Sequence, residues 1–315
     1  MTTHTDTSLA ALLLTQRLLD TPGAPLKSSE YWTLLDGVGD PADLLGRDAA
    51  AIQQRAGIDA ELAERLAYLL GAATAFAFKL DEAEQSGLRV VSSMHDAYPM
   101  VLRQRLGHSA PPLLYVVGDP TLLQTELLGI VGARDVSEAG AAVARGAAAE
   151  AAAQGLGVVS GGARGVDRLA MAASLEAGGR AVGVLADSLV RMTRDPEVRR
   201  AVSDGRICLC TPYKPTAGFS VANAMGRNKL IYALSRATLV VVADAEKGGT
   251  WAGAEESLRR GFAPVIAWSG DGQGAGNQRL IERGASRLES LADLFPLPDA
   301  AVGGRNSTEQ MRLKV

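Results

Sequence analysis

The chain has 315 residues, of which 47% are hydrophobic, 21% charged and only 4% aromatic, with a formal net charge of −3. This composition is typical of a globular protein with a sizeable core, and its slight acidity argues against a protein that coats DNA through overall basicity. Cys208 and Cys210 share one apolar run with no third cysteine or nearby histidine. We therefore expect buried thiols and no metal site.

The N-terminus has neither the basic segment nor the small-residue cleavage site of a secretory signal. No apolar stretch reaches the roughly 18 residues that a membrane-spanning helix needs. These features predict a cytoplasmic protein without a membrane partner.

Residues 9–80 show helical periodicity without a strand pattern. The spacing of apolar residues predicts helices over 9–19, 28–38 and 59–78. Ser28 or Ser29 is the expected N-cap of the second helix, and Asp59 that of the third. We predict a small helical domain over residues 1–83.

From residue 84 onward, short apolar strands alternate with helical segments. Strands that are apolar throughout and separated by helices favour a mostly parallel sheet covered on both faces. The predicted class is α/β, a doubly wound, Rossmann-like sheet over residues 84–297, followed by a flexible C-terminal tail over 298–315. The expected strands are 88–92, 113–117, 127–132, 156–160, 181–186, 207–210, 238–244 and 263–268.

Four segments near the strand-to-helix junctions carry glycine, hydroxyl and cationic residues together: 130–140, 160–171, 226–236 and 244–256. In the last of these, we expect a turn over residues 247–250 and a helix from Trp251 onward. A glycine turn lets the backbone approach a phosphate closely, and the following helix adds a partial positive charge. Ser137, Ser160 and Thr250 can add hydroxyl donors, and the full charges come from Arg134, Arg164, Arg227, Lys229 and Lys247. Neither the dinucleotide-binding fingerprint nor a P-loop is present. Asp167, in the first turn of a helix, either caps that helix or shapes the loop before it.

The ordered motifs resemble the DNA-processing protein A family, also called DprA or Smf, over roughly residues 30–290. The motifs are YPMVL (98–102), PPLLYVVG (111–118), VGARDVSEAG (131–140), SGGARGVD (160–167), RNKLIYALS (227–235), KGGTWAGA (247–254) and NQRLIERGA (277–285).

This resemblance implies a homodimer that binds single-stranded DNA in a positive pocket, protects incoming strands and helps load the recombinase RecA in natural transformation. It implies no catalytic residue, cofactor or metal. The expected phosphate-binding residues are Gly132, Arg134, Ser137, Ser160, Gly161, Gly162, Arg164, Gly165, Asp167, Arg227, Asn228, Lys229, Lys247, Gly248, Gly249 and Thr250.

Two other functions would use the same pocket. The segment GGTWAGAEE is similar to a turn of the LOG-like family of nucleotide N-glycosidases, in which Glu255 or Glu256 would help to activate water. A sensor that binds a nucleotide-like signal without catalysis is the other alternative.

Overall fold

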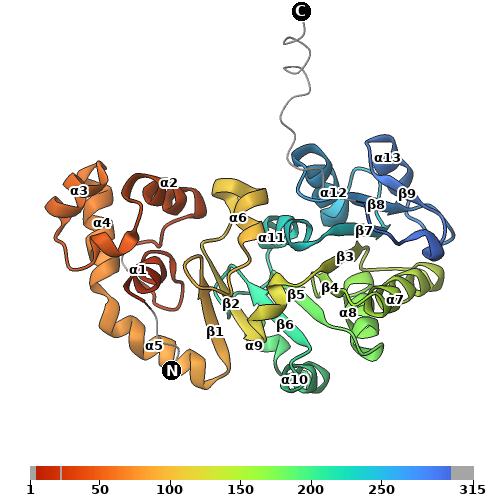
Figure 1. Ribbon diagram of the computed structural model, residues 1–315, viewed down its shortest axis with the longest axis horizontal. Helices are drawn as coiled ribbons and strands as arrows, with labels where there is room; N and C mark the ends of the chain where they lie inside the picture. The colour runs from red at the N-terminus through yellow and green to blue at the C-terminus, as the bar shows by residue number, and fades with distance from the viewer. Residues whose placement is uncertain (1–4, 22, 299–315) are drawn as a thin grey trace, which may run out of the picture. The chain divides into compact units, whose positions relative to one another are not determined.

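The computed structural model describes residues 5–21 and 23–298 (Figure 1). The α-helices of this part of the chain are α1 (Asp6–Thr15), α2 (Ser28–Val38), α3 (Ala49–Ala56), α4 (Ala60–Gly71), α5 (Ala73–Gln85), α6 (Met100–Leu106), α7 (Glu138–Ala153), α8 (Val166–Glu176), α9 (Leu189–Met192), α10 (Pro196–Ser203), α11 (Val221–Leu234), α12 (Gly248–Arg260) and α13 (Asn277–Glu282). Short 3-10 turns lie at η1 (Pro41–Leu44), η2 (Gly107–Ser109), η3 (Pro120–Gln124) and η4 (Leu291–Asp293).

The strands form a mostly parallel sheet in the order β1-β2-β6-β5-β4-β3-β7-β8-β9. The pairs β1–β2 and β2–β6 are antiparallel, whereas β3–β4, β3–β7, β7–β8 and β8–β9 are parallel. This arrangement confirms the predicted α/β, Rossmann-like class. The strands are β1 (Leu88–Ser92), β2 (Leu113–Gly118), β3 (Leu127–Gly132), β4 (Gly157–Ser160), β5 (Ala181–Val184), β6 (Ile207–Thr211), β7 (Ala237–Val242), β8 (Val265–Trp268) and β9 (Ser286–Leu288).

All eight expected strands are present, and β9 is an addition. It has three residues, of which two are exposed, so no apolar run reveals it in the sequence. The remaining strands of the sheet are buried over most of their length, as expected for strands covered on both faces.

The described residues fall into two compact units, and the chain passes between them at Thr125/Glu126, Ala181/Val182 and Arg227/Asn228. The first unit joins the N-terminal helices with β1, β2 and β6, and the second contains β3, β4 and β7–β9. The predicted boundary between residues 1–83 and 84–297 stays a prediction. The predicted tail lies outside the described residues except for Pro298.

In the first unit, polar contacts attach the helical segment to β1 and β2. The hydroxyls of Ser8 and Ser92 lie 3.0 Å apart, and the Trp32 indole N–H donates to the carbonyl of Ala110 at 2.8 Å. Four details differ from expectation. Helix α1 covers Asp6–Thr15 rather than residues 9–19, and α3 lies where no helix was predicted. Lys27 is the N-cap of α2, because its N–H donates to the Glu30 carboxylate. The helix that begins after Asp59 breaks at residue 72 and continues as α5.

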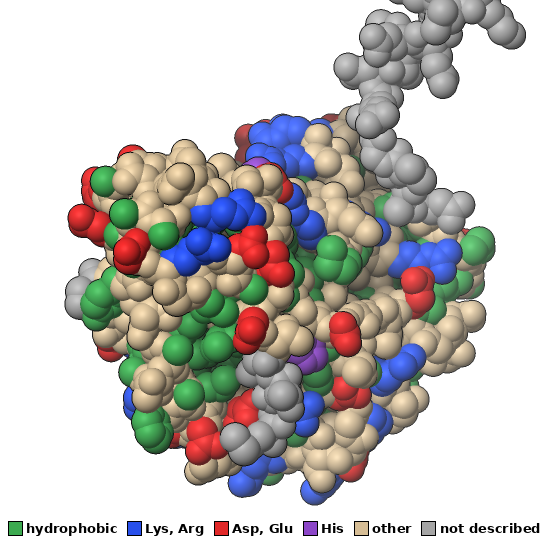
Figure 2. Space-filling model, turned by 60° about the vertical axis from the view of Figure 1, so that its left-hand side comes forward, with side chains coloured by type: hydrophobic (Ala, Val, Ile, Leu, Met, Phe, Trp, Pro, Cys, Tyr) green, Lys and Arg blue, Asp and Glu red, His purple; other side chains and the backbone are tan. Residues whose placement is uncertain are grey.

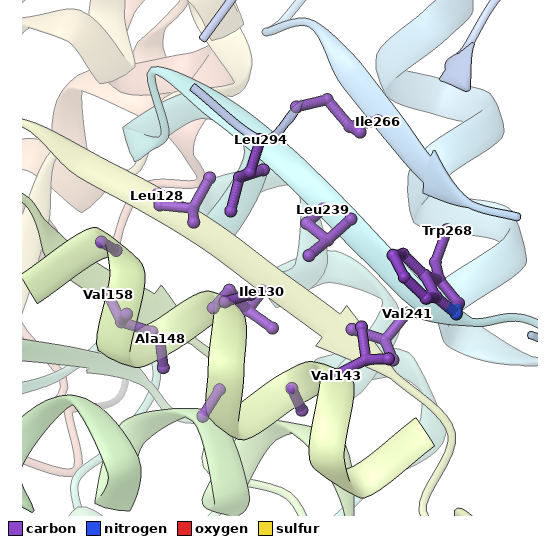
Figure 3. Close-up of a cluster of buried hydrophobic side chains, with 14 of the residues drawn as sticks. Leu128, Ile130, Val143, Ala148, Val158, Leu239, Val241, Ile266, Trp268 and Leu294 are labelled. Carbon is purple, nitrogen blue, oxygen red and sulfur yellow. The ribbon is translucent and has the colours of Figure 1, made fainter. Parts of the chain in front are cut away.

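The core of the second unit lies between its sheet and helix α7. Alanines on α7 allow a close approach to β3 and β7, and Figure 3 shows Val143 and Ala148 of this helix facing Ile130 and Val241. Helices α7 and α8 cover one face of these strands, and α12 and α13 cover the other (Figure 1). The core therefore holds the ends of β3, β4 and β7 in fixed positions.

Candidate phosphate-binding site

The carboxyl end of β3 is the point where the strand order of the sheet reverses. The chain continues from β3 to β4 on one side, whereas β7 lies on the other side of β3. In open α/β sheets, ligands bind in the crevice at such a switch point. Three turns lead away from this edge within the second unit: β3–α7, β4–α8 and β7–α12.

Gly165 brings the β4–α8 turn against the β3–α7 turn. It is the N-cap of α8, with φ +86° and ψ −133°, a conformation that non-glycine residues rarely adopt. A Cβ at this position would lie 2.4 Å from the carbonyl oxygen of Ala133 and 2.5 Å from that of Arg134. The next N–H, that of Val166, donates to the Ala133 carbonyl at 3.3 Å. Only glycine therefore permits this contact between the two turns.

The third turn joins the same place through Thr250. Its hydroxyl donates to the carbonyl of Gly132, the last residue of β3, at 3.1 Å. Gly249 is held from the other side, because the Asn228 amide of α11 donates to its carbonyl at 2.9 Å. The three turns thus meet around the end of β3.

Helix α12 begins earlier than predicted. The sequence placed Gly248–Thr250 in a turn before the helix, whereas these residues form its first turn and Lys247 is the N-cap. The first N–H groups of an α-helix have no partner within the helix, and the helix dipole makes this end partially positive. Backbone N–H donors, the Thr250 hydroxyl and Lys247 therefore lie together at one helix terminus.

Three cationic side chains at the turns are exposed: Arg134, Arg164 and Lys247. The Arg164 side chain is 71% exposed and contacts the Asp135 carboxylate at 2.6 Å. A salt bridge this exposed contributes at most about 1 kcal/mol, so a phosphate can compete for the arginine. Figure 2 shows, on another view of the molecule, that Lys and Arg side chains are interspersed with Asp and Glu. Carboxylates accompany the cations at the turns as well, namely Asp135, Asp244 and Glu246.

Several predicted residues shape the turns from within. The Ser160 hydroxyl is fully buried and donates to the Ile130 carbonyl at 2.6 Å. Asp167 is buried and accepts from the Ala163 N–H at 3.4 Å, which supports the loop-shaping role. The Ser137 hydroxyl caps α7 by accepting from the Gly140 N–H at 3.2 Å.

The two glycines after β4 are part of the same turn. Gly161 is buried, and Gly162 has φ +66°. The Gly162 carbonyl accepts from the Arg168 guanidinium at 3.3 Å. The turn is thus fixed by contacts on both sides of Arg164.

The basic residues of α11 differ from those of the turns. Lys229 is half-buried, and this burial lowers its pKa, while the Glu256 carboxylate acts in the opposite direction. It therefore faces the later turns of α12. Arg227 belongs to the first unit and is only 6% exposed. Burial raises the pKa of the Cys210 thiol to about 12, and the Arg227 charge opposes this increase, so the guanidinium lies near β6.

Both cysteines are buried free thiols, as predicted. Burial raises the pKa of Cys208 as well. Within residues 5–21 and 23–298, no three His, Cys, Asp or Glu side chains are arranged to hold a metal ion. No helix in the same residues is long and apolar enough to cross a membrane.

The glutamates of the hydrolase alternative point to other partners. Glu255 is paired with Arg283, and Glu256 lies 3.6 Å from Arg260. Seven residues separate Glu255 from the start of α12, which corresponds to about 10 Å along the helix axis. Arg283 also lies 3.9 Å from Glu246 of the β7–α12 turn, so an arginine stands between Glu255 and that turn.

Two residues at this edge were not predicted from the pattern. Asp135 holds Arg164, as described above. Asn277 is fully buried; its amide donates to the carbonyls of Val241 and Trp268 at 2.9 and 2.8 Å, and its oxygen accepts from the Ala243 N–H at 2.8 Å. Asn277 therefore fixes the chain as it leaves β7. Its only signal in the sequence was its place in the NQRLIERGA motif.

Comparison with known proteins assigns the chain to a protein family. The family model described as DNA recombination-mediator protein A matches residues 89–297. The DNA processing protein DprA of Bacillus subtilis is 30% identical over 224 residues, which is 69% of this chain and 74% of the relative. That of Streptococcus pneumoniae is 29% identical over 65% of this chain and 72% of the relative.

Two solved structures share the fold. The DNA processing protein A of Streptococcus pneumoniae superposes with a TM-score of 0.58 at 24% identity, over 85% of this chain and 96% of that one. The Helicobacter pylori protein, whose structure is described as showing a single-stranded DNA binding mode, gives a TM-score of 0.54 at 23% identity, over 65% of this chain and 92% of that one.

Proposed function

The chain belongs to the DNA recombination-mediator protein A family, and from this premise we propose that it binds single-stranded DNA at the three turns around the end of β3. The observation that carries the proposal is the meeting of these turns. Gly165 lies against Ala133 and Arg134, and Thr250 is bonded to Gly132. The Helicobacter pylori relative, with its single-stranded DNA binding mode, supports the same class of ligand.

The backbone and the cations have different tasks in this proposal. The N–H groups of Gly248 and Gly249 at the start of α12 receive one phosphate, and the helix dipole adds to the attraction. Arg134, Arg164 and Lys247 neutralise this phosphate and its neighbours along the strand. Such contacts read no base, so binding is nearly independent of sequence and weakens with salt.

Asp135 controls access to Arg164. In the free protein the Asp135 carboxylate accepts a hydrogen bond from the Arg164 guanidinium at 2.6 Å. A phosphate replaces this carboxylate when the strand binds. The exposure of both side chains makes this exchange inexpensive. Arg227 and Lys229, which are buried and half-buried, position α11 and leave the phosphate contacts to the exposed cations.

The proposal extends to the role of the protein in the cell. The protein acts by binding and without a catalytic step, needs no cofactor, and serves DNA processing in the cytoplasm. As a homodimer, it protects incoming single strands and helps to load the recombinase RecA during transformation.

Fluorescence anisotropy of labelled oligo-dT tests the binding site. We expect Arg164→Ala and Lys247→Ala each to weaken binding by about tenfold or more, because each removes a charge-assisted contact. Lys79→Ala is the matched control, since Lys79 is an exposed lysine of the first unit. Unchanged affinity in both site variants, with circular dichroism unchanged, would place the DNA elsewhere.

The same protein tests the alternatives. Nucleoside monophosphates are incubated with the wild-type chain and the released base is measured. Release of base that is lost in Glu255→Gln would establish the hydrolase and overturn the non-enzymatic proposal. Tight binding of a mononucleotide at the turns without binding of oligo-dT would establish the sensor.

A further inference from the structure

A cavity lies within the first compact unit, and none of the residues that line it belongs to the three turns. Its volume is about 390 Å³, which is in the size range of small-molecule sites. The segment that follows α1 supplies Arg17, Asp20 and Thr21, and the segment that follows β6 supplies Tyr213 and Lys214. The cavity is therefore built from parts of the chain that are almost 200 residues apart.

Arg17 is the feature that indicates a ligand. Its backbone N–H donates to the Tyr115 hydroxyl at 2.5 Å, which fixes the residue to β2. Its side chain is half-buried at the cavity, and among the described residues none forms an ion pair with its guanidinium. Arginine at such a site commonly binds a planar or tetrahedral oxyanion through two parallel hydrogen bonds.

Lys214 gives the cavity a second cation. Its ammonium lies 3.0 Å from the Asp20 carboxylate, and both side chains are exposed. With Arg17, Lys214 and Asp20 all charged, the cavity has a surplus of one positive charge. The surplus and the weakness of an exposed salt bridge both favour an anionic ligand.

Tyr213 and Asn223 form another side of the cavity. The Tyr213 hydroxyl donates to the Asn223 carbonyl at 3.0 Å, so this side of the cavity is fixed in the free protein. The cavity volume of about 390 Å³ is that of a site for a small organic molecule, which is larger than a bare phosphate.

We propose that this cavity binds a phosphate-bearing ligand of mononucleotide size, with Arg17 and Lys214 on the phosphate. The ligand is a free mononucleotide or one nucleotide of a strand, which share this chemistry. The proposal goes beyond the DNA site at the turns, because its residues all lie in the first unit.

Isothermal titration of the full chain with dTMP tests the proposal. We expect binding to the wild type, a loss of about tenfold or more in Arg17→Ala, and no change in Arg199→Ala, an exposed arginine of the same unit outside the cavity. Thymidine, which lacks the phosphate, should bind at least tenfold more weakly than dTMP. Equal binding of thymidine and dTMP, or no binding of dTMP, would overturn the proposal.

Two further variants separate this site from the other and from a folding defect. Asp20→Asn frees Lys214, so dTMP should bind about two- to fivefold more tightly, which loss of structure cannot cause. Lys247→Ala should leave dTMP binding unchanged. If Lys247→Ala abolishes dTMP binding and Arg17→Ala does not, the mononucleotide binds at the turns instead. A competition experiment in the Lys247→Ala variant identifies the occupant. If oligo-dT displaces bound dTMP, the occupant is one nucleotide of a strand; if dTMP stays bound, the occupant is a free mononucleotide.

Discussion

Replacement of Gly165 by alanine tests whether the close contact of two turns builds the site. The residue has φ +86° and ψ −133°, so alanine there costs about 1–3 kcal/mol from backbone strain. The new Cβ would lie 2.4 Å from the Ala133 carbonyl oxygen, so the turns must separate. That movement also breaks the Val166–Ala133 hydrogen bond, worth about 1 kcal/mol. We expect a total loss of about 2–4 kcal/mol in the free energy of unfolding.

Gly178 at the end of α8 provides a matched control in the same unit. Its φ is +78°, but a Cβ there would meet no atom within 4 Å. Gly178→Ala should therefore cost only the positive-φ strain, about 1–2 kcal/mol. Urea unfolding measures both variants, and oligo-dT affinity should decrease only in Gly165→Ala. Equal unfolding free energies for the two variants would refute the argument that the contact matters.

Three other perturbations test parts of the structure. The raised pKa values of Cys208 and Cys210 keep both thiols neutral at pH 8, so a thiol reagent should label neither until the protein unfolds. Asn277→Ala leaves buried carbonyls without donors and should destabilise the fold by about 3 kcal/mol, measured by urea unfolding. Burial opposes ionisation of Glu30, but the hydrogen bonds from Arg65 and from the Lys27 N–H, together with the charges of these two residues, outweigh it and lower the pKa of Glu30. Glu30→Gln should therefore cost more stability at pH 7 than at pH 3.

Each of these experiments has a result that would contradict it. Fast labelling of the folded protein would contradict the burial of the thiols. Gln278→Ala, at an exposed neighbour, should change stability by less than about 0.5 kcal/mol, and an equal effect of Asn277→Ala would contradict its role. A cost of Glu30→Gln that does not decrease on acidification through the ordinary carboxyl pKa of 4.5 would contradict the salt bridge.

The strands were predictable because most of them are apolar over nearly their whole length, as burial on both faces requires. Strand β3 has the predicted bounds, and so does β1, in which only Arg89 is exposed. The edge strand β9 lacks such an apolar run, since one face is open to solvent. The start of α12 was placed too late because glycines at 248 and 249 signal a turn, although a helix tolerates them in its first residues.

The members of the candidate site were easier to predict than their exposure. Glycine, hydroxyl and cationic residues after strands identified the turns. The sequence could not show that Ser160 is sealed inside the sheet or that Arg227 is buried, because exposure depends on packing across distant segments. Nor could it show Arg17 beside Lys214, which only the folded chain brings to one cavity.

The salt dependence of oligo-dT binding tests the central claim most directly. Three phosphate contacts, from Arg134, Arg164 and Lys247, predict a slope of about −2 for log affinity against log salt, or roughly a 20-fold loss from about 50 to 200 mM. Lys247→Ala should make the slope shallower by about 0.7, and Lys79→Ala should leave it unchanged. Absence of binding at low salt, or equal slopes in all three proteins, would contradict a phosphate site at these turns.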